Sequence, residues 1–177
     1  MKKIILSCLF FFSLEAEMLK LYKVYDGDTA LFSNNTVCRF AYIDTPESKM
    51  NIKTKKDIQK TGFSKDINIF SGRMASRYTK SILQKGAYYQ VKILGDESHG
   101  WGRKNKKRAI CLIYTQDGKN INEMIVKNGF GVPFYRYIHS CNLRKKYTDL
   151  VRYAKENKKG LWRIYPEFME SFLDIKK

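Results

Sequence analysis

Three charged side chains surround one short apolar run of this sequence. Arg39 lies near the start of the run, Asp44 closes it, and Glu47 follows in the turn after Pro46. Burying such charges costs free energy unless they pair with opposite charges or bind an ion. The stretch therefore predicts either a structural ion pair beside the proline turn or a site for an ion or an anionic substrate.

One reaction would use all of these groups. Hydrolysis of a phosphodiester needs a cation or an arginine near the non-bridging oxygens, a base for the attacking water, and a basic surface along which the substrate approaches. The sequence holds candidates for all three. Asp28 lies just after the turn Asp26-Gly27, from where it would meet Asp44 if the two strands are neighbours. Simple turn chemistry is the alternative explanation of Asp26 and Asp28, more so for Asp26.

The elements that would position these side chains are short strands. The composition of residues 19–25, 28–32 and 37–43 predicts an antiparallel meander, with turns at 26–27 and 33–35. Alternation along an unbroken strand would place Arg39 and Asp44 on opposite faces. We therefore expect the chain to bend at Asp44-Thr45-Pro46, where proline ends the strand.

The remaining chain alternates between helices and strands. Periodicity and glycine stops predict helices over 71–85, 120–128 and 142–159 and strands over 88–94 and 109–114. Residues 47–72 are polar, lysine-rich and without clear periodicity, and we interpret them as a long loop with at most a short helix. The tail from residue 164 has no assignment. This order predicts an α+β fold, an OB-type five-stranded antiparallel β-barrel with about three packed helices.

The charge balance indicates the kind of partner. The chain has 177 residues, 34 Lys and Arg against 17 Asp and Glu, and a formal net charge of +17. Such an excess favours a polyanionic partner, either nucleic acid or an anionic membrane surface. The length and the 44% hydrophobic content suit one compact domain.

The first residues have the layout of a secretory signal. Lys2 and Lys3 precede the apolar run 4–14, and Ala16 is a candidate cleavage position. The run is too short to cross a bilayer comfortably as a permanent helix. We expect residues 1–16 to be a signal peptide or an N-terminal membrane anchor, and the protein to be exported.

The cysteines do not have the spacing of a zinc site. Cys38 and Cys111 lie in apolar runs and are expected to be small core residues. With Cys141 they form an odd set, so the sequence leaves any disulfide pairing open.

A set of motifs in a fixed order resembles the staphylococcal-type nuclease (thermonuclease) family. The motifs are Asp26-Gly27-Asp28-Thr29, Arg39, Asp44-Thr45-Pro46-Glu47, Gly102-Arg103, 122–129 and 154–162. The match spans nearly the whole chain after residue 16, so the resemblance implies a nuclease-like domain over 17–163 followed by a C-terminal tail, 164–177. It also implies a calcium-dependent phosphodiesterase on an OB-type barrel that cleaves DNA and RNA and leaves 3′-phosphate ends.

The resemblance also assigns roles to residues. Asp28 and Asp44, with the carbonyl of Thr45, would bind Ca²⁺, an ion that prefers several oxygen ligands. Glu47 would position or deprotonate the attacking water, and Arg39 with a second arginine would clamp the phosphate. Asp26 would not bind the ion itself but would lie next to the residues that do. The aromatic side chains expected to line the nucleotide pocket are Trp101, Tyr135 and Tyr137.

The second arginine has two candidates. The family's arginine lies in a Tyr-Gly-Arg motif that leads directly into an apolar strand. Here Arg103 follows Trp101-Gly102, which matches the motif with tryptophan in place of tyrosine, while Arg108 lies directly before the strand. We favour Arg103 because the flanking glycine shapes the loop.

Two other classes of protein compete with a nuclease. One is a catalytically inactive OB-type module that only binds nucleic acid; it has no need of Asp28, Arg39, Asp44 and Glu47 together. The other is a basic protein of membrane surfaces, which leaves the carboxylates unexplained. For the nuclease we expect DNA and RNA as substrates, a monomer, and no stable protein partner.

Overall fold

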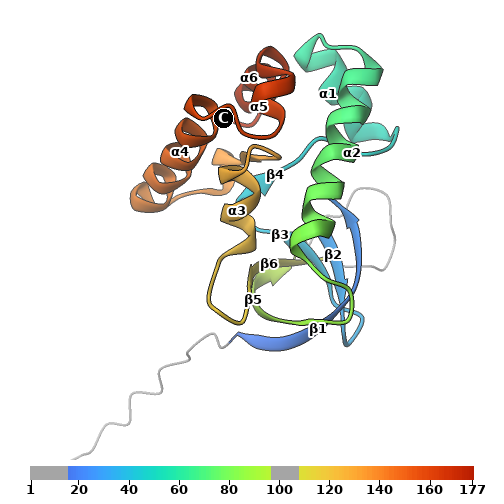
Figure 1. Ribbon diagram of the computed structural model, residues 1–177, viewed down its shortest axis with the longest axis vertical. Coiled ribbons are helices and arrows are strands. Elements are labelled where there is room, and N and C mark those ends of the chain that lie inside the picture. Colours follow the sequence, from blue (N-terminus) through green and yellow to red (C-terminus); the bar gives the residue numbers. More distant parts are fainter. Residues whose placement is uncertain (1–15, 97–107) are drawn as a thin grey trace, which may run out of the picture.

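A computed structural model of the chain describes residues 16–96 and 108–177. The expected leader apart from Ala16, together with Trp101 and Arg103, lies outside these residues. The described chain forms a barrel at one end and a group of helices at the other, with the C-terminus among the helices (Figure 1).

Five strands close the barrel in the order β1-β2-β3-β6-β5. They are β1 (Glu17–Asp26), β2 (Thr29–Phe32), β3 (Val37–Phe40), β5 (Tyr88–Asp96) and β6 (Ala109–Tyr114). This confirms the OB-type α+β fold. The expectation of a purely antiparallel barrel is wrong, because β3 and β6 pair in parallel. No hairpin joins these two strands: β4, α1, α2 and β5 lie between them in the chain, and so long a connection allows the parallel direction.

The strand expected over 37–43 is two strands. β3 ends at Phe40, and Tyr42 has a φ of 66°, a left-handed conformation that interrupts the ladder. β4 (Ile43–Asp44) then pairs with β7 (Val132–Pro133) in a separate two-stranded sheet. The bend therefore comes before Asp44, at residues 41–42, and not at the proline turn.

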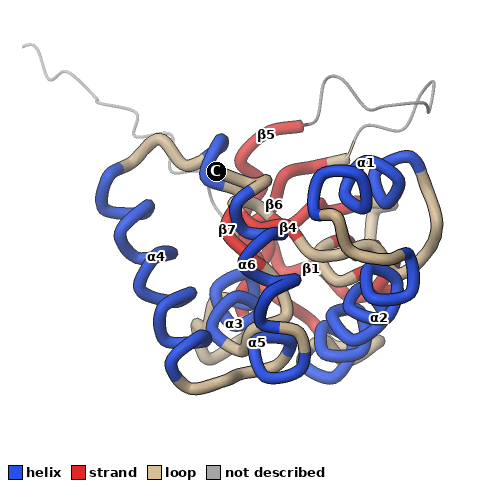
Figure 2. Tube along the Cα trace, turned by 90° about the horizontal axis from the view of Figure 1, so that it is seen from above, coloured by secondary structure: helices blue, strands red, loops and turns tan. Residues whose placement is uncertain are grey.

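Six helices, rather than about three, are present among the described residues. They are α1 (Ile52–Thr61), α2 (Lys65–Ile82), α3 (Ile121–Lys127), α4 (Cys141–Glu156), α5 (Leu161–Ile164) and α6 (Pro166–Asp174), with a 3-10 turn over Tyr135–Tyr137. In the view from above, α4 lies on one side of the strands and α1 and α2 lie on the other, while β5 extends beyond the helices (Figure 2).

The interpretation of 47–72 as a long loop is wrong. Asn51 caps α1 in a reciprocal capping box with Thr54, and Gly62 ends the helix at a φ of 74°. The buried residues of α1 are polar, namely Thr54, Asp57 and Thr61. A helix that buries polar side chains has no apolar period, so periodicity could not detect it.

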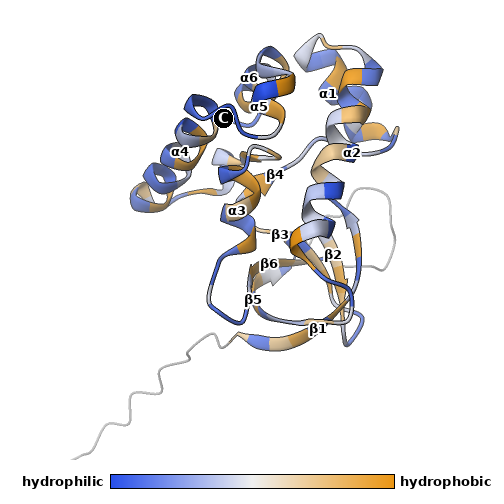
Figure 3. Ribbon diagram, viewed as in Figure 1, coloured by the Kyte–Doolittle hydropathy of each residue, from blue (hydrophilic) through white to orange (hydrophobic). Residues whose placement is uncertain are grey.

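The residues after 164 belong to the core. α6 buries Phe168, Met169 and Phe172 in the same hydrophobic cluster as the barrel interior. Hydrophilic residues cover much of α4, while its Tyr147, Val151 and Ala154 are buried (Figure 3). No helix in the two described ranges, 16–96 and 108–177, has the length and apolarity that crossing a membrane requires.

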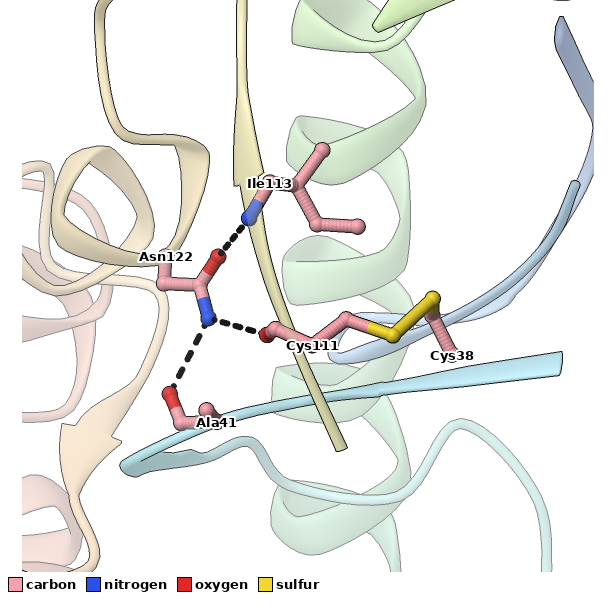
Figure 4. Close-up of a disulfide and its surroundings, with 5 residues drawn as sticks. All are labelled: Cys38, Ala41, Cys111, Ile113 and Asn122. Carbon is pink, nitrogen blue, oxygen red and sulfur yellow. Dashed lines mark hydrogen bonds between the residues drawn. A yellow bond between two sulfur atoms is a disulfide. The ribbon is translucent and has the colours of Figure 1, made fainter. Parts of the chain in front are cut away.

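A disulfide joins the parallel pair of strands inside the barrel. Cys38 of β3 and Cys111 of β6 are fully buried, as expected, and are bonded to each other with a Cα–Cα distance of 5.6 Å; Cys141 is free and exposed. Beside the disulfide, the buried amide of Asn122 accepts from the Ile113 amide at 3.1 Å and donates to the carbonyls of Ala41 and Cys111 at 3.0 Å (Figure 4). Asn122 thus ties α3 to the point where the chain leaves β3.

Candidate active site

Asp28, Arg39 and Asp44 converge where the barrel meets the helices. Asp28 lies in the turn between β1 and β2, Arg39 on β3 beside Thr29 of β2, and Asp44 on β4. The Arg39 guanidinium pairs with the Asp28 carboxylate through Nη1 and donates to Asp44 Oδ1 through Nη2. The left-handed turn before β4 brings Asp44 round to the face that carries Arg39, which strand alternation alone forbids.

Thr45 joins the carboxylate of Asp28 to the end of β4. Its amide and its hydroxyl donate to Asp28 Oδ2 at 3.0 and 3.1 Å. Asp28, Asp44 and Thr45 are all buried. Side-chain and main-chain atoms therefore fix the two aspartates in position before any ligand binds.

Lys53 links the base candidate to this cluster. Its Nζ donates to Glu47 Oε1 at 2.7 Å and to the Thr45 carbonyl at 3.1 Å, and lies 3.2 Å from Asp44 Oδ1. The other carboxylate oxygen of Glu47 accepts from Asn51 Nδ2 at 2.7 Å. Because Asn51 also caps α1, the start of this helix holds both Glu47 and Lys53.

Lys176 completes the cluster from the C-terminal side. Its Nζ lies 2.9 Å from Asp44 Oδ2 and 3.0 Å from Asp57 Oδ1, and it also faces the rings of Phe134 and Phe172. Its side chain is 8% exposed, whereas that of Lys53 is 35% exposed. Lys176 is therefore a buried support for Asp44, and Lys53 is the lysine that solvent reaches.

The charges shift the proton affinities of the cluster. Burial favours the neutral form of Asp44, but Lys53, Arg39 and Lys176 outweigh it and hold the pKa of Asp44 below its ordinary value. Burial likewise opposes the charged form of Lys53, but the carboxylates of Asp44 and Glu47 raise its pKa. The Asp44 carboxylate and the Lys53 ammonium are thus both charged at neutral pH.

Asp26 differs from the other carboxylates. Its Oδ1 accepts from the Gly27 amide at 2.9 Å and its Oδ2 from the Ser48 amide at 3.3 Å. Burial, followed by the neighbouring charges of Asp28 and Glu47, raises the pKa of Asp26 to about 6. Asp26 therefore braces the loop that carries Glu47, as a carboxyl that titrates near neutrality.

Two glycines let helix α2 and the barrel turn press against the site. A Cβ on Gly72 would lie 2.1 Å from the Glu47 carbonyl, and one on Gly27 would lie 2.6 Å from the Thr45 hydroxyl. The Gly27 carbonyl also accepts from the Thr79 hydroxyl of α2 at 2.7 Å. The backbone around Glu47 is thus held between α1 and α2.

The predicted nucleotide-binding residues are separated. Tyr135 is buried, its hydroxyl is 2.9 Å from the Thr148 hydroxyl, and Arg144 covers its ring, whereas Tyr137 is 55% exposed. Of this pair, Tyr137 offers the accessible ring. Trp101 and Arg103 fall outside the described ranges.

Arg108 lies directly before β6. β6 runs beside β3 with Ile110 opposite Arg39, and alternation places position 108 on the same face as Ile110. The register therefore puts both Arg39 and Arg108 on one face of the barrel, which leaves two candidates for the second arginine.

Sequence reasoning missed three residues of this cluster: Lys53, Asp57 and Lys176. Lys53 is one of several lysines in 47–72, and Lys176 lies in the unassigned tail. Asp57 faces inward from a helix that periodicity did not reveal. The capping pattern Asn51-x-x-Thr54 was the available signal, because it predicts where α1 begins.

Comparison with known sequences finds relatives of the nuclease class. The sequence model described as "Staphylococcal nuclease homologue" matches residues 37–164. Endonuclease YhcR of Bacillus subtilis (strain 168) is 27% identical over 153 residues, which is 84% of this chain and 12% of the relative. An uncharacterized protein of Bacillus anthracis is 27% identical over 154 residues, 85% of this chain and 63% of the relative.

The chain belongs to the staphylococcal nuclease homologue family, as its motifs predicted. The matched model and the endonuclease relative make this chain a nuclease domain. The chain spans only a part of both curated relatives, so their whole-protein properties are not carried over to it.

The family uses calcium, and the arrangement of oxygens tests whether this site fits the ion. The Thr45 carbonyl and Asp44 Oδ1 accept from Lys53 or Arg39, and Lys176 covers Asp44 Oδ2. Among residues 16–96 and 108–177, no group of three or more His, Cys, Asp or Glu side chains is arranged to hold a metal ion. The residue types suit calcium. Lys53 contacts two of the groups that would hold the ion, the Asp44 carboxylate and the Thr45 carbonyl, and its side chain is 35% exposed, so it would give way when calcium binds.

Proposed function

We propose that this protein hydrolyses phosphodiester bonds in DNA and RNA. The observation that carries the proposal is the convergence of a buried Asp28–Arg39–Asp44 cluster with Glu47, whose side chain is 19% exposed. The net charge of +17 supports a polyanionic substrate. Membership of the nuclease family supports the same reaction.

Each group has a role that its position supports. Arg39 is 13% exposed and held by two carboxylates, so its remaining N–H groups can donate to a phosphate oxygen with little reorganisation. Glu47 is fixed by Asn51 and Lys53 and accepts a proton from the attacking water. Tyr137 offers a ring on which a base can stack.

The reaction balances as a simple hydrolysis. The water oxygen forms a bond to phosphorus while its proton goes to Glu47, and the bond from phosphorus to the 5′ oxygen breaks. The leaving oxygen takes a proton from solvent, so the products are a 3′-phosphate and a 5′-hydroxyl. This polarity of cleavage rests on the family resemblance, as does the use of calcium, which the carboxylates of Asp28 and Asp44 and the carbonyl of Thr45 would bind.

Export is a separate proposal. It rests on the charged-then-apolar layout of residues 1–16. Size comparison of the chain from exporting cells with the full-length chain checks it: loss of about 16 residues is expected, and a full-length product in the cytoplasm would contradict it.

The first test is digestion of end-labelled single-stranded DNA and RNA, with Glu47→Gln as the variant. Gln keeps the shape and one hydrogen-bond acceptor but lacks the basic carboxylate, so we expect cleavage to fall about 10²–10⁴-fold. Glu156→Gln is the matched control, because Glu156 is exposed at the end of α4. Binding of both nucleic acids without cleavage by the wild type would identify a binding module instead.

The second arginine is tested in the same assay. Arg103→Ala is expected to abolish turnover while Arg108→Ala retains most of it. The reverse result would transfer the role to Arg108, in keeping with its register beside β3.

A further inference from the structure

An open groove of about 440 Å³ lies between β1 and the end of α2, outside the charged cluster of the active site. Buried apolar side chains form its floor, namely Leu21, Val24 and Leu83. The side chains at its rim are one tyrosine and three lysines, Tyr22, Lys23, Lys80 and Lys85. No carboxylate of the described residues lines it. The groove therefore presents positive charge beside an apolar surface.

A bulge in β1 aims two of these side chains outward together. Leu21 pairs with Phe32 and Lys23 pairs with Leu31, so Tyr22 is an extra residue in the ladder. Consecutive residues of a regular strand face opposite sides, but a bulge breaks this alternation. Tyr22 and Lys23 are accordingly both exposed, while Leu21 before them is buried. The bulge thus places a ring and an ammonium group side by side at the rim.

The opposite wall of the groove is the segment that leaves α2. The Gly86 amide donates to the Leu21 carbonyl at 2.8 Å, and the Leu21 amide donates to the Ala87 carbonyl at 2.9 Å. Lys85 comes directly before these residues, so its backbone is fixed beside β1. The two walls are therefore held together by main-chain hydrogen bonds and exist before any ligand binds.

The lysines of the groove have no acidic partner. Within the described part of the chain, no ion pair joins Lys23, Lys80 or Lys85 to a carboxylate, and Lys23 instead lies 5.4 Å from the ring centroid of Tyr25. Several exposed lysines elsewhere do pair with carboxylates. Uncompensated charges of one sign, gathered in one place, attract a polyanion.

A row of exposed cations on α2 leads from the groove toward the active site. Arg73, Arg77 and Lys80 are spaced by four and three residues, so they lie on one face of the helix. Arg73 directly follows Gly72, where an added Cβ would meet the Glu47 carbonyl. The eight residues from Gly72 to Lys80 rise about 12 Å along the helix. α2 packs on β1 and runs from α1 to the barrel (Figure 1). One strand of a few nucleotides can therefore reach both places.

We propose that the groove and the α2 row, Arg73, Arg77 and Lys80, form a second binding surface for single-stranded nucleic acid, outside the active site. The cations contact phosphates, and the Tyr22 ring stacks on a base, which binds a strand without sequence preference. The inference rests on the proposed function for the identity of the strand as substrate. It makes long strands better substrates than short ones, because only a long strand contacts both surfaces.

Binding is tested with the full chain carrying Glu47→Gln, so that the strand stays intact. The probe is fluorescein-labelled oligo(dT) of about 20 nucleotides, and anisotropy gives its Kd at several salt concentrations. Combining Lys23→Gln, Lys80→Gln and Lys85→Gln removes three phosphate contacts. We expect Kd to rise at least about tenfold and the slope of log K against log salt to become shallower by about 2.

The matched control removes the same total charge elsewhere. It combines Lys119→Gln, Lys145→Gln and Lys158→Gln, three exposed lysines on other parts of the surface. The control is expected to bind oligo(dT) nearly as well as the parent chain. Equal losses of affinity and of salt slope in the two triple variants would overturn the proposal, because the charge would then act only as a general field.

Tyr22→Leu separates stacking from charge. Leucine keeps an apolar side chain but has no aromatic face, so Kd should rise about fivefold or more while the salt slope stays the same. An unchanged Kd would refute base stacking in the groove. Vesicles of phosphatidylcholine and phosphatidylserine test a membrane as the rival partner. Vesicle binding that the groove variant loses, with unchanged binding of oligo(dT), would overturn the proposal.

Cleavage in calcium separates this inference from the proposed function. With Glu47 restored, the ratio of kcat/KM for the long oligo(dT) to that for a trinucleotide should fall about tenfold in the groove variant. An unchanged ratio would overturn the proposal. Absence of cleavage of both substrates by the wild type would end the proposed function, and anisotropy would still decide whether the groove binds nucleic acid.

Discussion

The barrel interior and the charged cluster are built on the same strands and stabilised in opposite ways. β3 turns Cys38 inward to the disulfide with Cys111, and turns the next residue, Arg39, outward to Asp28 and Asp44. Inside, apolar contact and one covalent bond hold the strands. Outside, alternating positive and negative groups hold turns and helices that come from distant parts of the chain.

This difference determines how each region responds to change. Apolar packing is non-directional and loses stability in proportion to the volume removed. A buried ion pair depends on its partner, and removing one member leaves an uncompensated charge. The interior should therefore tolerate substitutions that keep its volume. The charged cluster should lose stability when Arg39, Lys53 or Lys176 is replaced by an uncharged residue.

The largest effect is expected from Lys176→Met. It leaves Asp44 and Asp57 buried without the ammonium that lies 2.9 and 3.0 Å from them, so stability should fall by about 3–5 kcal/mol. Urea unfolding measures the change. Lys177→Met is the matched control, because its side chain is 61% exposed and pairs only with Asp174 among the residues described. Equal stability of the two variants would show that the cluster does not need Lys176.

A smaller loss of stability is expected when the disulfide is removed. Cys38→Ala with Cys111→Ala opens a link across 73 residues, which should cost about 2–4 kcal/mol by freeing the unfolded chain. Cleavage at 25 °C should change little, because Arg39 and Asn122 keep their partners. Cys141→Ser, at the exposed free cysteine, is the control. A large loss of activity in the folded double variant would mean that the interior also positions the site.

The smallest effect is expected from Asp26→Asn, which should change how the stability of the protein depends on pH. The pKa of Asp26 is raised from 3.8 to about 6, so between these values the unfolded chain releases this proton before the folded chain does. Its contribution to stability is therefore complete below pH 3.8 and lost as the pH rises through 6. The variant lacks this titration. Its free energy of unfolding relative to that of wild type should therefore rise as the pH increases from 3.8 to 6. Urea midpoints from pH 4 to 7 measure it, and parallel curves would contradict the shift.

Several features of the fold follow from local sequence. The Leu, Val and Tyr residues of 19–25 and the Asp26-Gly27 turn predict β1 and its hairpin, because strand and turn preferences act over a few neighbours. The helices over Ile121–Lys127 and Cys141–Glu156 were predicted because each buries one apolar face. Where the periodic signal was absent, as in α1, the prediction failed.

The candidate site also has features that local sequence predicts and features that only the fold produces. Asp28, Arg39, Asp44 and Glu47 could be selected by residue type, spacing and resemblance, because a few charged residues in an apolar setting are conspicuous. Their convergence depends on the left-handed turn at Tyr42 and the pairing of β4 with β7, which local preferences do not reveal. The direction of β6 beside β3 is equally a result of the whole fold.

By itself the sequence determined the barrel class, the family and the carboxylates, since those depend on local composition and on motif order. Only the tertiary structure decided which cations meet those carboxylates. Lys53 arrives from a helix with a polar buried face and Lys176 from the end of the chain, 132 positions after Asp44. Long-range ion pairs leave no local pattern, because a lysine that will be buried in a site has the same sequence context as one that remains in solvent.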